Sequence, residues 1–188
     1  ASSSDSNIII GGVGSLDKIT TGDSTDIVLG DNGEIKWTSG LLDSVSSTDH
    51  ILDDNGEMNY SGAIGAEQLA SLLSHLGEAG GDDIITLGSG DKVVIAGKGA
   101  DTVQTSLNSI GSRIVLGDEG QLDYDGNNIL KSAKSISTEG GDDILNLGGA
   151  SSSDSNVVIG GVGSLDTITT GDSTDIVLGD NGEIKWTS

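Results

Sequence analysis

Residues 80–105 read GGDDIITLGSGDKVVIAGKGADTVQT, and this stretch repeats itself on a step of nine residues. Glycines and aliphatic residues both keep the step, as seen in Gly81, Gly90 and Gly99 and in Ile85, Val94 and Val103. Nine residues suffice for a short strand and a tight glycine turn, so two units complete one coil and residues two steps apart stack. The stretch therefore predicts an all-β fold built as a parallel, β-roll-like β-solenoid.

Acidic residues follow the same step and are expected to form ladders along the coil. Asp83 and Asp101 lie two steps apart, and Lys92 lies midway between them. The coil therefore predicts that the two aspartates stack on one edge and that Lys92 lies on the opposite edge. A single step separates the residues of two further pairs, Asp17 with Asp26 and Asp166 with Asp175.

A much longer repeat covers the whole chain. Residues 150–188 repeat residues 1–39, so the period is 149 residues, and only Ile8/Val157, Ile9/Val158 and Lys18/Thr167 differ. One full period is followed by the start of the next, which indicates recent tandem duplication and a parent protein with many copies.

Within the period, an aliphatic triplet followed by Gly-Asp marks a weaker repeat. It occurs at 27–31, 114–118 and 176–180, with a degenerate copy at 50–54. A turn, Asn-Gly in most copies, and a short alternating stretch follow each marker. Because Asn-Gly between β-rich runs is a strong hairpin signal, we expect each marker strand to fold back through this turn onto the next strand.

All four aromatic residues of the chain end these alternating stretches: Trp37, Tyr60, Tyr124 and Trp186. One interpretation is that they cover the end of the aliphatic stack. The other is that they stack on sugars.

One segment departs from the β pattern. Leucines at helical spacing, Leu69, Leu72, Leu73 and Leu76, are followed by Gly77, which predicts a short amphipathic helix over about residues 66–76. The helix is expected to cap or flank the coil, and a partner-binding helix is the alternative.

The sequence divides the chain into three predicted modules. Residues 1–77 hold hairpins and the helix, 78–137 form a second solenoid module, and 138–188 form the third, which is the start of the next repeat.

Composition limits the function. The net charge is -22, aromatic residues make up 2% of the chain, and Cys, Pro and Phe are absent. The core must then be thin and built from Ile, Val and Leu. The acidity excludes a nucleic-acid-binding surface and makes divalent cations the natural counterions. No apolar run reaches the roughly 20 residues of a membrane span, so no membrane insertion is expected.

Residues 96–104, AGKGADTVQ, closely resemble the calcium-binding RTX repeat, whose pattern is Gly-Gly-x-Gly-x-Asp-x-aliphatic-x. Residues 11–19 and 160–168 look similar but carry one extra residue before the Asp, and 80–85 and 140–145 look like the second half of the motif. The resemblance implies that glycine turns present carbonyl oxygens and that aspartates of successive turns share Ca²⁺. The candidate ligands are Asp17, Asp26, Asp82, Asp83, Asp101, Asp142, Asp143, Asp166 and Asp175.

Physical chemistry supports a cation at such ladders. Two carboxylates about 5 Å apart repel by roughly 3 kcal/mol at an effective dielectric constant of about 20. Calcium accepts carboxylate and carbonyl oxygens in a flexible cage, so metal binding linked to folding is expected. Two cationic residues depart from the pattern, because Lys92 occupies an expected Asp position and Arg113 aligns with Asp26 and Asp175. A cationic side chain can take the place of the ion, so we expect calcium at only some of the positions. The alternative is that the aspartates only cap turns by accepting hydrogen bonds from backbone amides.

An enzyme is not expected. The histidines, His50 and His75, fall on a hairpin strand and on the predicted helix, and no nucleophile motif is present. Paired carboxylates such as Asp82 and Asp83 are the parts that glycoside cleavage uses, but every acidic feature here recurs, whereas an active site is unique.

The sequence favours a calcium-stiffened structural repeat of a secreted or bacterial cell-surface protein: a stalk, fibre, sheath or adhesin extender, similar to giant RTX-type adhesins. A carbohydrate-binding module that uses the aromatic positions and takes glycans as partners is the alternative. An ice-binding solenoid would need rows of Thr-x-Thr, and only isolated pairs such as Thr20-Thr21 occur. Because a repeat that follows itself presents complementary edges, neighbouring copies are the expected partners, with head-to-tail filaments as one outcome.

Overall fold

The computed structural model describes residues 6–12, 17–23, 25–31, 33–47, 80–127, 129–148 and 153–187. These residues form strands and turns, with no helix among them. The predicted helix at 66–76, the degenerate marker at 50–54 and Tyr60 lie outside the described residues.

Sheet A contains six parallel strands in the order β1-β3-β7-β9-β13-β15. They are β1 (Ser6–Ile10), β3 (Thr25–Leu29), β7 (Lys92–Ile95), β9 (Arg113–Leu116), β13 (Ser155–Ile159) and β15 (Thr174–Leu178).

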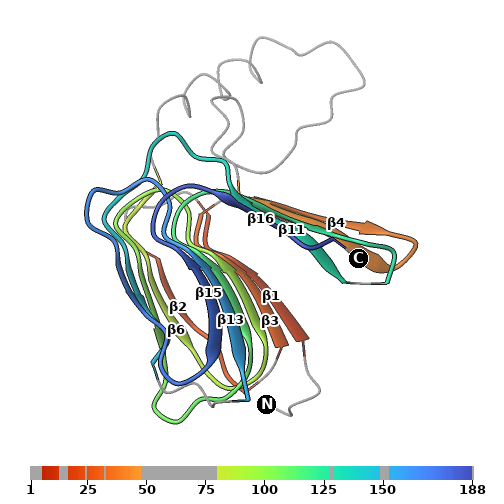
Figure 1. Ribbon diagram of the computed structural model, residues 1–188, viewed down its shortest axis with the longest axis horizontal. Coiled ribbons are helices and arrows are strands. Elements are labelled where there is room, and N and C mark those ends of the chain that lie inside the picture. Colours follow the sequence, from red (N-terminus) through yellow and green to blue (C-terminus); the bar gives the residue numbers. More distant parts are fainter. Residues whose placement is uncertain are drawn as a thin grey trace, which may run out of the picture.

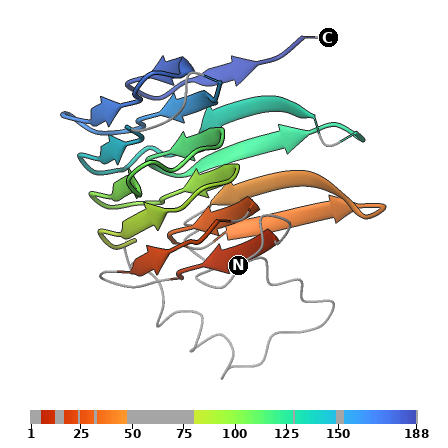
Figure 2. The same cartoon turned by 90° about the horizontal axis from the view of Figure 1, so that it is seen from below.

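Sheet B contains five parallel strands in the order β2-β6-β8-β12-β14. They are β2 (Lys18–Thr20), β6 (Ile84–Leu87), β8 (Thr102–Thr105), β12 (Ile144–Asn146) and β14 (Thr167–Thr169). When sheet C is left aside, strands of sheets A and B alternate along the chain. Each new strand lies next to the preceding strand of its own sheet (Figure 2). The prediction of an all-β fold with parallel strands is confirmed.

Sheet C is antiparallel, with the order β4-β5-β10-β11-β16. Its strands are β4 (Gly33–Thr38), β5 (Leu41–Ser47), β10 (Gly120–Tyr124), β11 (Leu130–Ser135) and β16 (Glu183–Lys185). In Figure 1 the strands of each sheet lie nearly behind one another, and sheet C projects to one side.

Hairpins are present, but the predicted fold-back is wrong for the three marker strands that the structure describes, β3, β9 and β15. The marker strand β3 stays in sheet A, whereas the strand after its Asn-Gly turn, β4, enters sheet C and pairs with β5. The β4–β5 hairpin turns at Ser39 and Gly40, which both have positive φ (56° and 82°), as a two-residue hairpin turn requires. Asn-Gly therefore marks the passage from one sheet to another.

Sheet A is the middle layer and is covered on both faces. The central residue of each aliphatic triplet, such as Val28, packs against sheet B, in a core with Ile85 and Val103. The last residue of the triplet, such as Leu29, packs against sheet C, in a second core with Val45 and Leu122. A strand that is buried on both faces needs a continuous apolar run, which explains the Ile-Val-Leu marker.

Candidate functional site

One aspartate stands directly before each strand of sheet B, and the parallel register stacks these residues. Asp83 precedes β6 and Asp101 precedes β8, and Ile84 pairs with Thr102. The pairing of the other sheet B strands places the aspartates before β2, β12 and β14 in line with these two. The five residues, here called the aspartate row, are Asp17, Asp83, Asp101, Asp143 and Asp166. The predicted stacking of Asp83 on Asp101 is confirmed, and the row extends it in both directions.

A hydrogen bond joins each member of the row to the next. The backbone N–H of Asp83 donates to Asp101 Oδ1 (2.7 Å), and that of Asp101 donates to Asp143 Oδ1 (2.8 Å). At the ends of the row, Asp17 donates to Asp83 (2.8 Å) and Asp143 donates to Asp166 (3.0 Å). The turn-capping interpretation is therefore correct for one oxygen of these carboxylates.

The second carboxylate oxygen has no such bond. Asp83, Asp101 and Asp143 are 2%, 1% and 0% exposed, and the Oδ2 atom of each has no hydrogen-bond partner among the described residues. Asp17 Oδ2 is buried and likewise has no partner in the described part of the chain. Such buried acceptors are costly when nothing binds them.

Main-chain carbonyl groups lie against the same oxygens. A Cβ atom added to Gly30, at the end of β3, would collide with both Asp83 Oδ2 and the carbonyl oxygen of Ala96. Gly117, after β9, stands in the same relation to Asp143 Oδ2 and the carbonyl oxygen of Gly160. Carboxylate and carbonyl oxygens thus converge at glycine positions along the row, and both are ligands that calcium prefers.

The surroundings of the row disfavour ionised carboxylates. Burial, together with the neighbouring carboxylates and against the hydrogen bonds from backbone N–H groups, raises the pKa of Asp101 to about 9 and that of Asp143 to about 8. Burial also raises the pKa of Asp83 to about 6. In the described part of the chain, no lysine or arginine forms an ion pair with any member of the row.

A second polar row, here called the mixed row, lies at the other end of the same core and has its own countercharge. Each member is the first or second residue of a strand of sheet A. From one side of the sheet to the other they are Asn7, Asp26, Lys92, Arg113, Asn156 and Asp175, and each pairs with the next. Lys92 Nζ lies 3.3 Å from Asp26 Oδ2, and both side chains are fully buried. Asp26 also accepts a hydrogen bond from Asn7 Nδ2 (2.7 Å). The predicted placement of Lys92 opposite the stacked aspartates is confirmed.

The candidates Asp26 and Asp175 therefore belong to the mixed row. Asp175 accepts hydrogen bonds from Asn156 Nδ2 (2.9 Å) and Ser173 Oγ (2.7 Å). Two other candidates, Asp82 and Asp142, are exposed and cap the next turn: Asp82 Oδ1 accepts from Ala100 N–H (2.8 Å), and Asp142 Oδ1 accepts from Ser164 and Leu165. None of these four carboxylates joins the aspartate row.

Two buried aspartates are absent from the ligands that the sequence predicts. Asp31 and Asp118 end the markers after β3 and β9 and are 2% and 1% exposed. Asp118 Oδ2 accepts from Val162 N–H, and burial raises the pKa of Asp118 to about 7. A Cβ atom on Gly161 would collide with Asp118, as one on Gly97 would with Asp31. The repeated Gly-Asp of the marker is a signal in the sequence that was not used to predict them.

Side chains alone do not complete a metal site here. Within the described ranges, no three His, Cys, Asp or Glu side chains gather closely enough to hold an ion. A cation on the aspartate row would have to take main-chain oxygens as well, which is the arrangement at Gly30 and Gly117.

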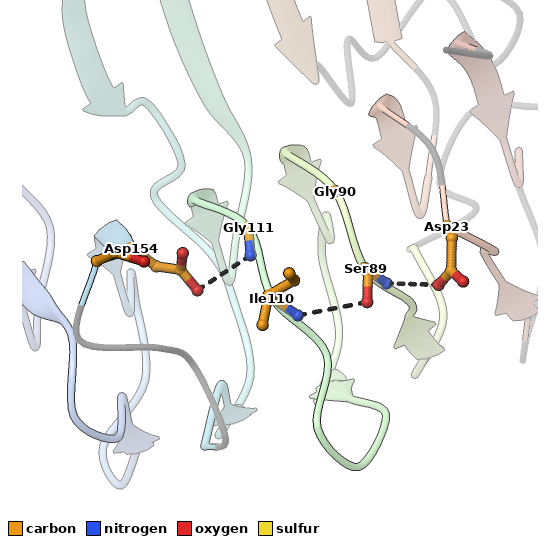
Figure 3. Close-up of a pocket in the computed structure, with 7 residues that line it drawn as sticks. Asp23, Ser89, Gly90, Ile110, Gly111 and Asp154 are labelled. Atoms are coloured by element: carbon orange, nitrogen blue, oxygen red, sulfur yellow. Dashed lines mark hydrogen bonds between the residues drawn. The ribbon is translucent and has the colours of Figure 1, made fainter. Parts of the chain in front are cut away.

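A groove of about 350 Å³ lies at the opposite turns, between the ends of the sheet B strands and the starts of the sheet A strands (Figure 3). Asp23 accepts from Ser89 N–H (3.1 Å) and Asp154 accepts from Gly111 N–H (3.0 Å). Its carboxylates thus tie successive turns together. The lining residues are Asp23, Ser89, Gly90, Ile110, Gly111, Ser153 and Asp154, none of them aromatic.

The aromatic positions mostly cover the core. Tyr124 and Trp186 pack against the cluster between sheets A and C, and burial raises the pKa of Tyr124 to about 12. Trp37, at the outer end of β4, is 50% exposed.

No helix that would span a bilayer occurs in the part of the chain that the structure describes. Comparison with protein-family models, with curated proteins and with solved structures found no match to this chain.

Proposed function

We propose that this chain is a calcium-binding structural repeat of a secreted or bacterial cell-surface protein, in which sheets A and B are the walls of a β-solenoid. The observation that carries the proposal is the aspartate row, in which the buried Oδ2 atoms of Asp17, Asp83, Asp101 and Asp143 accept no hydrogen bond from the described residues. A repeated site of this kind serves a rod better than it serves catalysis, because each coil adds one more equivalent site.

Two ways exist to neutralise the row at neutral pH. Protonation is one: the raised pKa values of Asp101 and Asp143 allow it at pH 7, whereas Asp83, with a pKa of about 6, would be mostly ionised. A divalent cation is the other: it neutralises neighbouring carboxylates together and also takes the carbonyl oxygens at Gly30 and Gly117. Calcium fits better than magnesium, because magnesium demands small octahedral geometry and keeps its water ligands.

The mixed row supports the same reasoning by contrast. There the backbone spacing is that of the aspartate row, yet Lys92 supplies the positive charge beside Asp26. An ion is needed only where the chain provides no cation. Calcium is therefore assigned to the aspartate row alone, and Asp26 and Asp175 are not ligands in this proposal.

The test is thermal unfolding of the chain, followed by circular dichroism, in EGTA, in millimolar calcium and in millimolar magnesium. We expect calcium to raise the melting temperature steeply and magnesium to raise it little, since binding to the native state alone stabilises it. Isothermal titration calorimetry of the same protein gives the number of ions bound.

Two aspartate variants sharpen the test. Asp101→Asn removes the charge from the centre of the row and should abolish most of the calcium-induced shift. Asp43→Asn, at an exposed position of β5 outside both rows, should leave the shift unchanged. If calcium raises the melting temperature of both variants equally, or does not raise that of the unmodified chain, the row consists of turn caps and the proposal fails.

A further inference from the structure

The two near-identical segments of this chain lie in different surroundings. β13 and β15 repeat β1 and β3. At the end of β13, Ile159 is fully buried, whereas its counterpart Ile10 on β1 is 48% exposed. β13 has β9 on one side and β15 on the other, while β1 ends sheet A. The difference in burial therefore comes from the neighbouring strand, since the residues are the same.

The strand that covers β13 shows what would cover β1. β9 pairs with β13 so that Arg113 lies beside Asn156 and Leu116 lies beside Ile159. Asn7 and Ile10 are the corresponding residues of β1. The intervening Val157 and Val158 become Ile8 and Ile9, which keep the aliphatic character of the row.

The other two sheets repeat this correspondence. In sheet B, β12 pairs with β14 through Leu145 and Ile168, and Ile19 of β2 is the copy of Ile168. In sheet C, β11 pairs with β16 through Ala133 and Ile184, and Ile35 of β4 is the copy of Ile184. One edge, formed by β9, β12 and β11, thus binds one copy of the repeated segment in all three sheets.

The aspartate row would also continue across such a contact. Asp143 N–H donates to Asp166 Oδ1 across the β12–β14 boundary (3.0 Å). Asp17 is the copy of Asp166 and would accept the same bond. Both copies of the segment, residues 6–38 and 155–187, can therefore form the same hydrogen bonds and apolar contacts with this edge, in the same register.

We propose that the edge formed by β9, β12 and β11 is a docking surface for the N-terminal segment, residues 6–38, of a second copy of this chain. In the isolated chain its own residues 155–187 occupy the edge and act as a cap. When the cap is released, the N-terminal segment of another molecule replaces it by strand exchange, and the molecules join head to tail. The inference rests on the repeat and the register, so it holds whether or not calcium binds.

The test uses the full chain with one substitution in each copy of the segment. Val158→Asp places an unpartnered carboxylate in the core beneath β13 and so loosens the cap. Ile9→Asp places the same charge on β1 and spoils the exchanging segment. Sedimentation velocity over a range of concentrations, in millimolar calcium and again in EGTA, measures association.

Val158→Asp should self-associate at concentrations at least about tenfold lower than the unmodified chain requires. The double variant with Ile9→Asp should remain monomeric, because its open edge meets no intact segment. Mixed with the unmodified chain, the double variant should capture one molecule and form a 1:1 dimer.

Two results would overturn the proposal. One is a Val158→Asp protein that keeps its β-type circular dichroism yet stays monomeric. The other is a double variant that associates as strongly as Val158→Asp, which would make the association non-specific. Should Val158→Asp fail to fold, Ile159→Ala loosens the cap more mildly and is measured in the same way. Calcium titration of these variants reports separately on the aspartate row, so the failure of one proposal is distinguishable from the failure of the other.

Discussion

At the scale of single residues, neighbouring strands repeat the same backbone geometry but differ in the charge that each carries. In the mixed row, Lys92 compensates the charge of Asp26: its Nζ lies 3.3 Å from Asp26 Oδ2 and donates to the carbonyl oxygen of Ser89 at 2.6 Å. Removing one partner of a buried pair leaves the other charge uncompensated. Lys92→Ala should therefore lower the free energy of unfolding by about 3 to 5 kcal/mol, measured by urea denaturation.

The matched control is Lys36→Ala. Lys36 pairs with Glu34 at 2.7 Å, but both side chains are substantially exposed, so the loss should not exceed about 1 kcal/mol. Equal losses in the two variants would show that the Lys92–Asp26 pair does not hold the mixed row together.

The aspartate row predicts an unusual dependence of stability on pH. In the folded chain the pKa of Asp101 is raised to about 9 and that of Asp143 to about 8, above the ordinary value of 3.8. At these two residues the native state then binds more protons than the unfolded state, so without calcium the row's contribution to stability is greatest at low pH and falls as pH rises from about 4 towards 9. Melting temperatures in EGTA should be lower at pH 8 than at pH 5.

Calcium should reverse that trend, because it binds the ionised carboxylates. The same melting series in millimolar calcium should show stability that holds or rises between pH 5 and pH 8. A calcium-free chain that is equally stable at pH 5 and pH 8 would contradict the buried, proton-binding state of the row.

The sequence predicted part of the aspartate row for a clear physical reason. Residues two steps apart in a coil must stack, so the spacing of Asp83 and Asp101 is enough to predict that they lie side by side. The one-step spacing of Asp26 from Asp17 and of Asp175 from Asp166 places these two residues on the opposite edge, as it does Lys92. Spacing alone does not reveal that they meet Asn and Lys side chains there. Asp31 and Asp118 were missed because their carboxylates face glycines that follow the neighbouring strand of sheet A, a contact that depends on how the turns stack.

At the scale of strands, the aliphatic triplet was visible in the sequence but its third layer was not. A continuous apolar run indicates a strand covered on both faces. What covers the second face is an antiparallel sheet of hairpins, assembled from segments at 33–47, 120–135 and 183–185. The Asn-Gly signal is local, whereas pairing across three sheets is not, and the non-local pairing decided which strand β4 joined.

The contribution of sheet C to stability can be measured at the core between sheets A and C. Leu116, on β9, is fully buried there, and Leu116→Ala should lower the free energy of unfolding by about 2 to 5 kcal/mol. Leu107 lies in a turn and is 92% exposed, so Leu107→Ala should change it by no more than about 0.5 kcal/mol. Urea denaturation of both variants decides, and a small loss at Leu116 would mean that sheet C packs loosely on sheet A.

At the scale of the whole molecule, one period of the repeat contributes the same number of strands to each of the three sheets. Since β13, β15, β14 and β16 copy earlier strands, one period contributes β1, β3, β7 and β9 to sheet A, β2, β6, β8 and β12 to sheet B, and β4, β5, β10 and β11 to sheet C among the described residues. Each sheet therefore advances by four strands per period. A stack of three sheets can grow without limit only if all advance together, because otherwise one sheet would fall out of register with its neighbours.

This equality sets the length of any longer molecule. Strands in a sheet are about 4.8 Å apart, so one period of 149 residues should lengthen the stack by about 19 Å. Small-angle X-ray scattering of chains that carry one, two and three additional periods should show the maximum dimension rising by this constant step while the cross-section stays fixed. If each added period formed a separate bead on a linker, the step would be larger and the cross-section would no longer describe a single rod. An increment near 19 Å would instead identify the period as the growth unit of one continuous three-sheet fibre.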